Sequence, residues 1–341
     1  MLTRGPEREI EETATGARAE QTEWANEPRS HPTGSSPNRS PPRGPMTSIV
    51  VIGRESDVCC QLVRARLAAD GRECLFVPED ELLPGLHFAW RISGDESEGT
   101  VGMGSRPIPF SDLGGVLARA WGIPVSVSSF QTKDGQYITS EWSALLLAWL
   151  HRLPCPVINR LRPELWYKTH LHVPEIVALA PGVPFKWPAV RVTTSADEAR
   201  DFYHRCRGRV RYWPLTQHVP YPVETAADLD KLATLAATLP LYLTEAVAGE
   251  RRDAYVVGPH VVPVAMDGGR AEALPAPVAR RCRDIAHALD LTFCMLSLVA
   301  TGGGDWYGVR LDRMPSLIEV GEEARQEIAG DLVVALTGSA A

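Results

Sequence analysis

Residues 48–53 read Ser-Ile-Val-Val-Ile-Gly. Four consecutive aliphatic residues ended by a glycine are typical of a strand that is buried on both faces. A helical pattern follows as far as Ala69, with Ser56 as its expected N-cap, and a second apolar run occupies 74–77. This β-α-β beginning predicts an open, mostly parallel sheet with helices on both faces, that is, a doubly wound α/β domain.

The next elements extend this sheet. The clearest strand pattern covers 115–119, and Ser140 is the expected cap of a helix that places Trp142 and Trp149 on one apolar face. A short strand at 157–159 follows. The two tryptophans have the helical spacing of core residues, and an interface role is the alternative.

The second half of the chain has a different order of elements. Helices are expected at 163–180, 195–206, 226–239, 277–289 and 319–336, the last of them capped by Gly338. Strands are expected at 209–213, 241–247, 255–257, 261–265, 292–299 and 306–311, with a hairpin at Gly258-Pro259. Strands that follow one another without crossover helices favour an α+β domain with antiparallel pairing.

Residues 1–45 differ from the rest because they lack a hydrophobic period and are rich in proline, arginine and glutamate. Such a segment cannot offset its ordering entropy by burial, so we expect a disordered tail. Met46 directly precedes the first strand, and translation from Met46 is an alternative to a true tail. The expected organisation is a tail at 1–45, an α/β domain at 46–160 and a second domain at 161–341.

Composition excludes several classes of function. The net charge is −7, which disfavours a nucleic-acid-coating surface, and no apolar run reaches the ~18 residues of a membrane span. Seven cysteines without a repeated C-x-x-C spacing are typical of reduced thiols, and no secretory signal begins the chain, so we expect a cytoplasmic protein. Lysine is rare, with only Lys133, Lys168, Lys186 and Lys231 in the chain.

Short sequence motifs of known function are largely absent from the chain. The chain has no phosphate loop of the G-x-x-x-x-G-K-S/T type and no G-x-S-x-G elbow. His170-Leu-His172 alternates as metal ligands on a strand would, but it lies in a segment with a helical pattern and without a third ligand, so we favour a structural role. Gly302-Gly303-Gly304 fits a hairpin tip better than a phosphate site.

The order of landmarks after Gly115 resembles the ATP-grasp superfamily, in particular the ribosomal-peptide maturases of the microviridin and graspetide type. Val157-Ile158-Asn159-Arg160 resembles a strand-Asn-basic step of that family, and residues 182–194 resemble its entry to the nucleotide-binding core. Residues 243–247 resemble the hinge strand, 254–258 the "R-V-x-V-V-G" segment, and 305–315 the "G-W-Y-x-x-E-V-N-x-x-P" segment. The resemblance implies a pre-ATP-grasp domain followed by an ATP-grasp-like body with central and C-terminal subdomains.

The resemblance also implies a nucleotide site. Lys168 would contact phosphate, Thr244, Glu245 and Val247 would frame adenine, and Asp312 would hold Mg²⁺; no catalytic residue is implied. Several positions depart from the family pattern. The strand 209–213 precedes Pro214 without the family's lysine, and Ser297 and Arg310 stand where the family carries acidic metal ligands. Asp253 stands where it carries an arginine.

Three hypotheses follow. In the first, the nucleotide site has decayed and the chain is a non-catalytic partner for a precursor peptide or a companion ATP-grasp ligase. In the second, it is an active ATP-dependent carboxylate–amine or carboxylate–hydroxyl ligase, with ATP and Mg²⁺ as cofactors. In the third, only the fold is shared and some other small-molecule role applies. Proteins of this fold are often dimers, so a homodimer is a further expectation; no nucleic-acid or membrane partner is expected.

Overall fold

The computed structural model describes residues 48–94, 96–104, 107–120, 133–160, 165, 170–215 and 219–338. The expected tail at 1–45 and Lys168 lie outside these residues. Within the described part of the chain, no helix combines the length and apolarity needed to cross a bilayer.

A parallel sheet forms the first half of the described chain, as the β-α-β pattern predicted. Its order is β2-β1-β6-β7, from β1 (Ser48–Gly53), β2 (Cys74–Pro78), β6 (Leu113–Ala118) and β7 (Val157–Ile158). Each adjacent pair of strands is parallel. The prediction of a parallel α/β sheet is confirmed.

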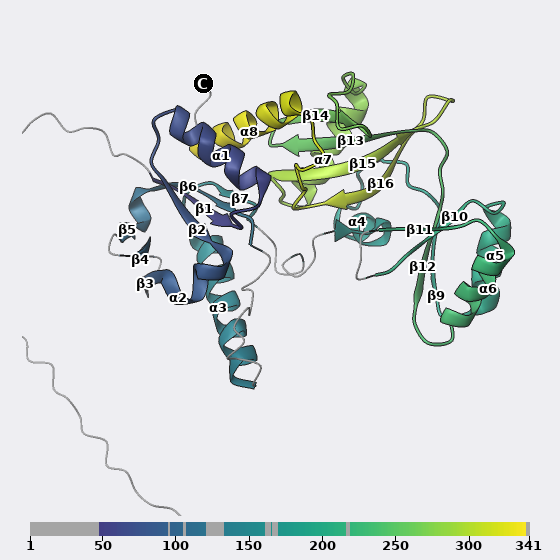
Figure 1. Ribbon diagram of the computed structural model, residues 1–341, viewed down its shortest axis with the longest axis horizontal. Coiled ribbons are helices and arrows are strands. Elements are labelled where there is room, and N and C mark those ends of the chain that lie inside the picture. The colour runs from purple at the N-terminus through teal and green to yellow at the C-terminus, as the bar shows by residue number, and fades with distance from the viewer. Residues whose placement is uncertain are drawn as a thin grey trace, which may run out of the picture. The chain divides into compact units, whose positions relative to one another are not determined.

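Helices cover both faces of this sheet. Helices α1 (Val58–Ala69) and α8 (Glu322–Thr337) contact each other and share a core with Ile49, Val51 and Leu117 (Figure 1). On the opposite face of the sheet, Val50, Ile52 and Val116 belong to a second core together with helix α3 (Lys133–Arg152). Trp149 on α3 is 1% exposed, so its predicted core position is confirmed.

Two expected helix starts are wrong. Asp57, not Ser56, caps α1, because its Oδ1 accepts the backbone N–H groups of Cys59 at 2.8 Å and Cys60 at 3.4 Å. Ser140 lies inside α3, whose first described residue is Lys133. Serine favours an N-cap but also occurs within helices, so its presence alone does not mark a start.

A small antiparallel sheet extends this half. It has the order β3-β4-β5, from β3 (Leu86–Ser93), β4 (Glu96–Met103) and β5 (Ile108–Pro109). The short connecting helices are η1 (Glu79–Glu81), α2 (Leu82–Gly85) and η2 (Phe110–Asp112). Phe88 packs its ring against Trp149 with the ring centroids 5.6 Å apart, which ties this sheet to α3.

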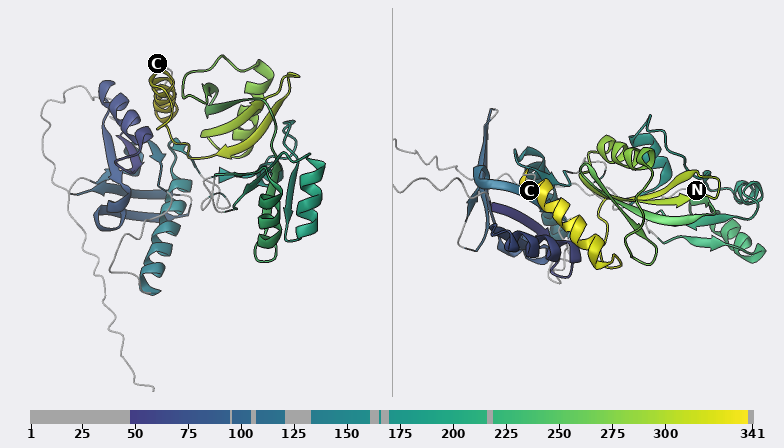
Figure 2. Two further views of the ribbon diagram at one scale, coloured as in Figure 1. Left: turned by 45° about the vertical axis from the view of Figure 1, so that its right-hand side comes forward. Right: turned by 90° about the horizontal axis from the view of Figure 1, so that it is seen from above.

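A second antiparallel sheet lies in the middle of the chain, which we call the central sheet. It has the order β11-β10-β12-β9, from β9 (Val190–Thr193), β10 (Val210–Trp213), β11 (Tyr221–Val223) and β12 (Leu241–Glu245). Helices α5 (Ala196–Arg205) and α6 (Ala226–Leu235) lie side by side against one face of it (Figure 2). Ser195 caps α5 as predicted.

The third large sheet, which we call the C-terminal sheet, is also antiparallel. Its order is β14-β13-β15-β16-β8, from β8 (His170–Leu171), β13 (Glu250–Val257), β14 (His260–Ala265), β15 (Phe293–Ala300) and β16 (Trp306–Asp312). Helix α7 (Ala276–Ala288) packs against it, and α8 ends at Gly338 with φ +62°, as expected of a glycine C-cap.

The helix expected over 163–180 is confirmed over 173–179 and wrong at 170–171. Residues 170–171 form strand β8, which pairs with β16, and helix α4 covers only Val173–Leu179. Pro174 lies in the first turn of α4, where proline favours a helix start. The alternation at His170-Leu-His172 was therefore a strand signal.

Asn159 ties the parallel sheet to the C-terminal sheet. It is 4% exposed, and its Nδ2 donates to the carbonyl oxygens of Phe293 at 2.6 Å and Arg313 at 2.9 Å. Its Oδ1 accepts the N–H of Phe293 at 2.8 Å. The side chain of Asn159 therefore joins the end of β7 to residues 134 and 154 positions away in the chain. The boundary predicted at 160/161 stays a prediction.

Candidate functional site

The residues predicted to frame adenine lie where the central sheet connects to the C-terminal sheet. Thr244 and Glu245 end β12, and Val247 lies in the linker between β12 and β13. The N–H of Glu245 donates to the carbonyl of Ala189 at 2.8 Å, and its Oε1 lies 3.6 Å from Nη2 of Arg209. The three residues adjoin along the chain, but the side chains of Thr244 and Glu245 belong to opposite faces of β12, and contact with adenine stays a prediction.

The two faces of the central sheet differ in character. Val210, Leu241 and Leu243 point toward α5 and α6, with which they form one core. Because side chains alternate along a strand, Arg211, Trp213, Tyr242 and Thr244 belong to the opposite face. We call this the open face of the central sheet, because neither α5 nor α6 covers it.

Trp213 occupies the position before Pro214 where the family pattern has a lysine. Its side chain is 4% exposed, and its Nε1 donates to Oγ1 of Thr244, which is itself 2% exposed, at 2.9 Å. The buried N–H of the indole therefore has its hydrogen-bond acceptor in the hydroxyl of Thr244. A buried, neutral side chain stands where a phosphate-binding cation was expected.

Aromatic side chains fill the space next to Trp213. His172, just before α4, lies 4.6 Å from the ring centroid of Tyr242 and 6.0 Å from that of Trp213. The N–H of Val173 donates to Oη of Tyr242 at 3.2 Å, and burial raises the pKa of Tyr242 to about 12. The start of α4 therefore covers this part of the open face with aromatic rings.

The predicted metal ligand lies on one face of the C-terminal sheet with three other polar residues. Asp253 is paired in register with Ser297, and Ser297 with Arg310, on the adjacent strands β13, β15 and β16. Asp312 lies two residues beyond Arg310, so its side chain belongs to the same face. The four residues form a row that crosses three strands.

Three members of this row stand where the family pattern has metal ligands. Ser297 is neutral, Arg310 is cationic, and both carboxylate oxygens of Asp312 lie next to other protein groups. Oγ of Ser297, which is 2% exposed, donates to Oδ1 of Asp253 at 2.7 Å. Oδ1 of Asp312 accepts the N–H of Met314 at 2.9 Å, and its Oδ2 lies 3.2 Å from Nδ1 of His170. The sequence showed the strand-like alternation of His170 and His172, but it did not indicate that His170 lies beside Asp312.

Positive charges gather near the start of β13. Burial lowers the pKa of Arg211, and the nearby Arg251 lowers it further. Burial raises the pKa of Tyr255, and Asp253 and Asp312 raise it further. Arg251 is therefore close enough to act on Arg211, and Asp253 and Asp312 are close enough to act on Tyr255.

This row is a poor fit for Mg²⁺ bound with ATP. Magnesium prefers several oxygen ligands, usually carboxylates together with phosphates. Among the described residues, no three His, Cys, Asp or Glu side chains are grouped so that they could hold a metal ion. Arg310 adds a positive charge where the family pattern has a carboxylate. Lys168 lies outside the described residues, so the predicted site is seen only in part.

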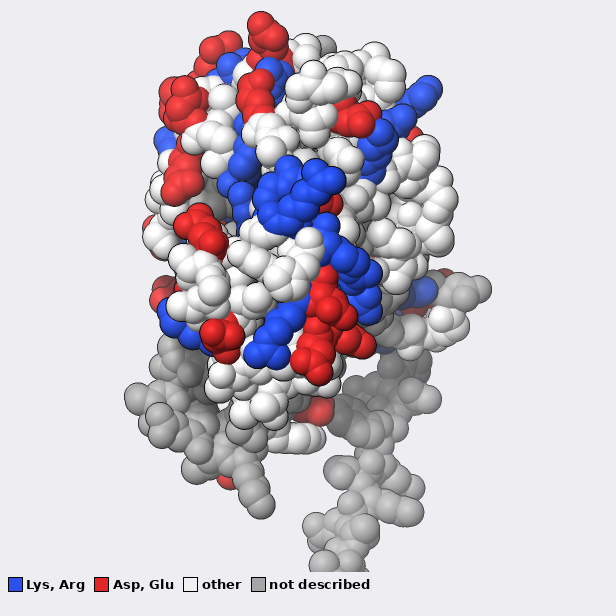
Figure 3. Space-filling view, turned by 90° about the vertical axis from the view of Figure 1, so that its right-hand side faces the viewer, with Lys and Arg blue, Asp and Glu red and all other residues white. Residues whose placement is uncertain are grey.

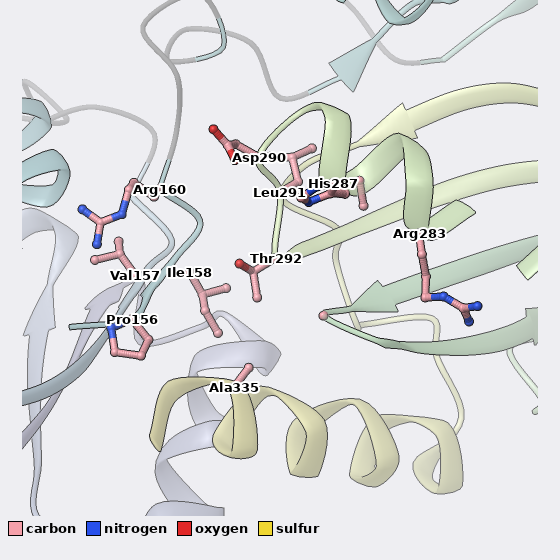
Figure 4. Close-up of a pocket in the computed structure, with 12 residues that line it drawn as sticks. Pro156, Val157, Ile158, Arg160, Arg283, His287, Asp290, Leu291, Thr292 and Ala335 are labelled. Atoms are coloured by element: carbon pink, nitrogen blue, oxygen red, sulfur yellow. The ribbon is translucent and has the colours of Figure 1, made fainter. Parts of the chain in front are cut away.

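A separate cavity of about 460 Å³ lies between β7, the end of α7 and α8 (Figure 4). Ile158 and Thr292 point into it, and Arg283 points away. The guanidinium of Arg160 donates to four carbonyls at the end of α3 and just beyond it, which caps that helix. This cavity contains none of the predicted site residues.

No protein-family model matches this chain, and no curated protein matches it. Solved structures do. The macrocyclase MdnC of Microcystis aeruginosa MRC, bound with its precursor peptide MdnA, superposes with a TM-score of 0.71 at 12% identity, over 86% of this chain and 100% of MdnC. The chain has the ATP-grasp fold.

Two further ATP-grasp structures agree. The RiPP-associated ATP-grasp ligase of Chryseobacterium gregarium, in complex with ADP and leader and core peptides, gives a TM-score of 0.70 at 15% identity over 87% of this chain and 98% of that one. The ligase PsnB, complexed with a minimal precursor, Mg and ADP, gives 0.69 at 19% identity over 86% and 99%. At these identities the likeness concerns the fold, and the resemblance to graspetide-type ATP-grasp ligases expected from the order of landmarks is confirmed at that level.

Proposed function

We propose that this chain is a non-catalytic relative of ribosomal-peptide maturases, with a decayed nucleotide site, that binds a precursor peptide or a companion ATP-grasp ligase. The observation that carries the proposal is Trp213. A phosphate-binding position needs a cation, and Trp213 supplies a buried, neutral indole whose N–H is committed to Thr244.

The row on the C-terminal sheet supports the same proposal. Phosphoryl-transfer sites of this kind work mainly by placing positive charge and metal ions around the phosphates. Loss of one such electrostatic group can reduce the rate by about 10²–10³-fold. Ser297 and Arg310 replace two acidic ligands, and both oxygens of Asp312 already have protein neighbours. Several losses at once leave little catalytic power.

The peptide partner is proposed by analogy with the structural neighbours. MdnC is bound with its precursor peptide, and PsnB is complexed with a minimal precursor. A fold and its catalytic site are separable, so a surface that binds peptide can persist where the nucleotide site does not. A short open reading frame next to this gene would support a peptide pathway, and an intact ATP-grasp gene beside it would support the partner role.

An active ligase is the second candidate, and one observation favours it: Asp253 and Asp312 place two carboxylates in the same row. In that case Lys168 contacts phosphate, Thr244, Glu245 and Val247 frame adenine, and Asp312 holds Mg²⁺. The bound nucleotide and metal would supply the activated phosphate and its charge neutralisation.

Calorimetric titration with ATP separates the two. The full chain and its Lys168→Ala variant are titrated with ATP in the presence and absence of Mg²⁺. The proposal predicts that no Mg²⁺-dependent binding tighter than millimolar occurs in either protein. Mg²⁺-dependent micromolar binding that the variant loses would replace the proposal with the active ligase.

A further inference from the structure

A cavity of about 300 Å³ lies at the edge of the central sheet and α5. It lies between β9, the end of α5, the turn into β10 and the end of β12. Four arginines line it: Arg191, Arg205, Arg207 and Arg209. Figure 3 shows that Lys and Arg side chains gather in the middle of this side of the molecule.

The positive charge of this cavity is only partly compensated. Among the described residues that line it, Glu245 is the one carboxylate, against four guanidinium groups. Oε1 of Glu245 lies 3.6 Å from Nη2 of Arg209, and Oε2 of Glu198 lies 3.8 Å from Nη1 of Arg191. A charge-assisted hydrogen bond is about 2.7–2.9 Å long, so these two contacts leave hydrogen-bonding capacity on both arginines.

Arg191 gives direct evidence of a missing acceptor. Its Nε is buried and has no hydrogen-bond partner among the described residues. A buried donor without an acceptor costs free energy, so such groups are usually satisfied by protein, water or a ligand. The guanidinium of Arg191 lines the cavity, and its side chain is 38% exposed, so its Nη groups are the donors that an oxyanion there would meet.

The backbone at Arg207 is a second and independent observation. Arg207 has φ +53° and is followed by Gly208 at φ +74°, after helix α5 ends. Glycine and asparagine are the residues that adopt this left-handed conformation easily, and arginine does so at a cost. An arginine in a strained backbone conformation that also lines a cavity favours a functional role for its side chain.

We propose that this arginine cavity binds a compact phosphate-bearing anion. Guanidinium groups recognise phosphate through paired N–H donors in a fixed planar arrangement, and several of them around one cavity match a multivalent oxyanion. The cavity lies on the α5 side of the central sheet, because Arg191 is paired in register with Leu243, which points toward α5 and α6. It shares Glu245 with the predicted nucleotide site. The proposal goes beyond the proposed function and does not depend on it.

Calorimetric titration of the full chain with inorganic pyrophosphate, without Mg²⁺ and at physiological ionic strength, tests this site. We expect binding in the micromolar range that weakens at least tenfold in Arg207→Gly and in Arg191→Gln. Glycine accepts the left-handed backbone, so Arg207→Gly should fold with an unchanged or higher melting temperature. Arg200→Gln is the matched control: Arg200 lies on α5 and does not line the cavity, so its affinity should stay within twofold of the parent.

Four results would overturn the proposal. The first is absence of binding below millimolar pyrophosphate. The second is an equal loss in Arg200→Gln, which would indicate a general charge effect. The third is tighter binding of citrate, which would make the ligand a carboxylate. The fourth is binding lost in Lys168→Ala but kept in Arg207→Gly, which would place the anion at the predicted nucleotide site. Neither an empty arginine cavity nor a filled one decides whether Mg²⁺ and ATP bind, so the two proposals fail separately.

Discussion

Replacing Trp213 with lysine would restore the charge that the family pattern places before Pro214. Under the proposed function this change is strongly destabilising. The indole is 4% exposed and packs beside Tyr242 and His172, and its Nε1 donates to Thr244. An ammonium group at this position would be buried among aromatic side chains.

The magnitude follows from two contributions. Truncation of a buried tryptophan costs about 3–5 kcal/mol, and the lysine methylenes recover only part of that packing. An unpaired buried charge adds a penalty of several kcal/mol, which the protein reduces by lowering the pKa of the amine. We expect Trp213→Lys to lose about 4 kcal/mol of unfolding free energy at neutral pH.

The pH dependence has a definite sign. If burial lowers the amine pKa in the folded state, the unfolded chain binds more protons, so the stability of the variant rises with pH. The defect relative to the parent should therefore shrink between pH 7 and the ordinary lysine pKa of about 10.4. Trp213→Phe is the control, because it keeps an aromatic ring and removes the hydrogen bond to Thr244 at a cost of about 1–2 kcal/mol.

Urea unfolding of the parent and both variants, with and without Mg²⁺ and ATP, measures these effects. The expected result is a large defect in Trp213→Lys that nucleotide does not repair. If Trp213→Lys lies within about 1 kcal/mol of the parent and Mg²⁺ with ATP then stabilises it, the position is a working phosphate site and the reasoning is refuted.

Three further predictions concern other parts of the structure. Asn159→Leu removes the partner of three buried backbone groups, so the free energy of unfolding in urea should fall by about 3–5 kcal/mol. A decrease below about 1 kcal/mol would contradict the role of Asn159 in joining the sheets. Ser297→Asp places a carboxylate within hydrogen-bond distance of Asp253, which raises the pKa of one of the two acids. Because the native state then binds more protons than the unfolded chain, the stability of the variant should fall as pH rises from 5 to 8. A urea midpoint that does not depend on pH would argue against this pairing. Burial raises the pKa of Cys59 to about 11 and of Cys282 to about 12, so these thiols should react with a disulfide reagent at pH 8 far more slowly in native than in unfolded protein, and equal rates would contradict their burial.

Local patterns predicted the parallel sheet well. The aliphatic run at 48–53 and the strand pattern at 115–119 identified β1 and β6, because strands buried on both faces are continuously apolar. The hairpin at Gly258-Pro259 and the C-cap at Gly338 were also correct, since each depends on local turn chemistry. These features require no knowledge of distant residues.

Contacts between distant residues were harder to predict. The strand at His170 exists because it pairs with Asp312, which is 142 residues away, so its own neighbours favoured a helix. Trp213 was quoted only as part of a strand that lacked lysine, and its burial under Tyr242 and Thr244 depends on sheet register. The pairing of Ser297 with Asp253 likewise follows from the order of strands in the C-terminal sheet.

The central claim is that the nucleotide site no longer binds ATP with Mg²⁺. Its most direct test is the unfolding free energy of the full chain, measured with Arg207→Gly and Lys168→Ala in millimolar ATP with and without Mg²⁺. A ligand at a hundred times its Kd stabilises the folded state by about 2.7 kcal/mol. A decayed nucleotide site predicts no Mg²⁺-dependent stabilisation in any of the three proteins. A gain of that size that needs Mg²⁺, persists in Arg207→Gly and disappears in Lys168→Ala would contradict it.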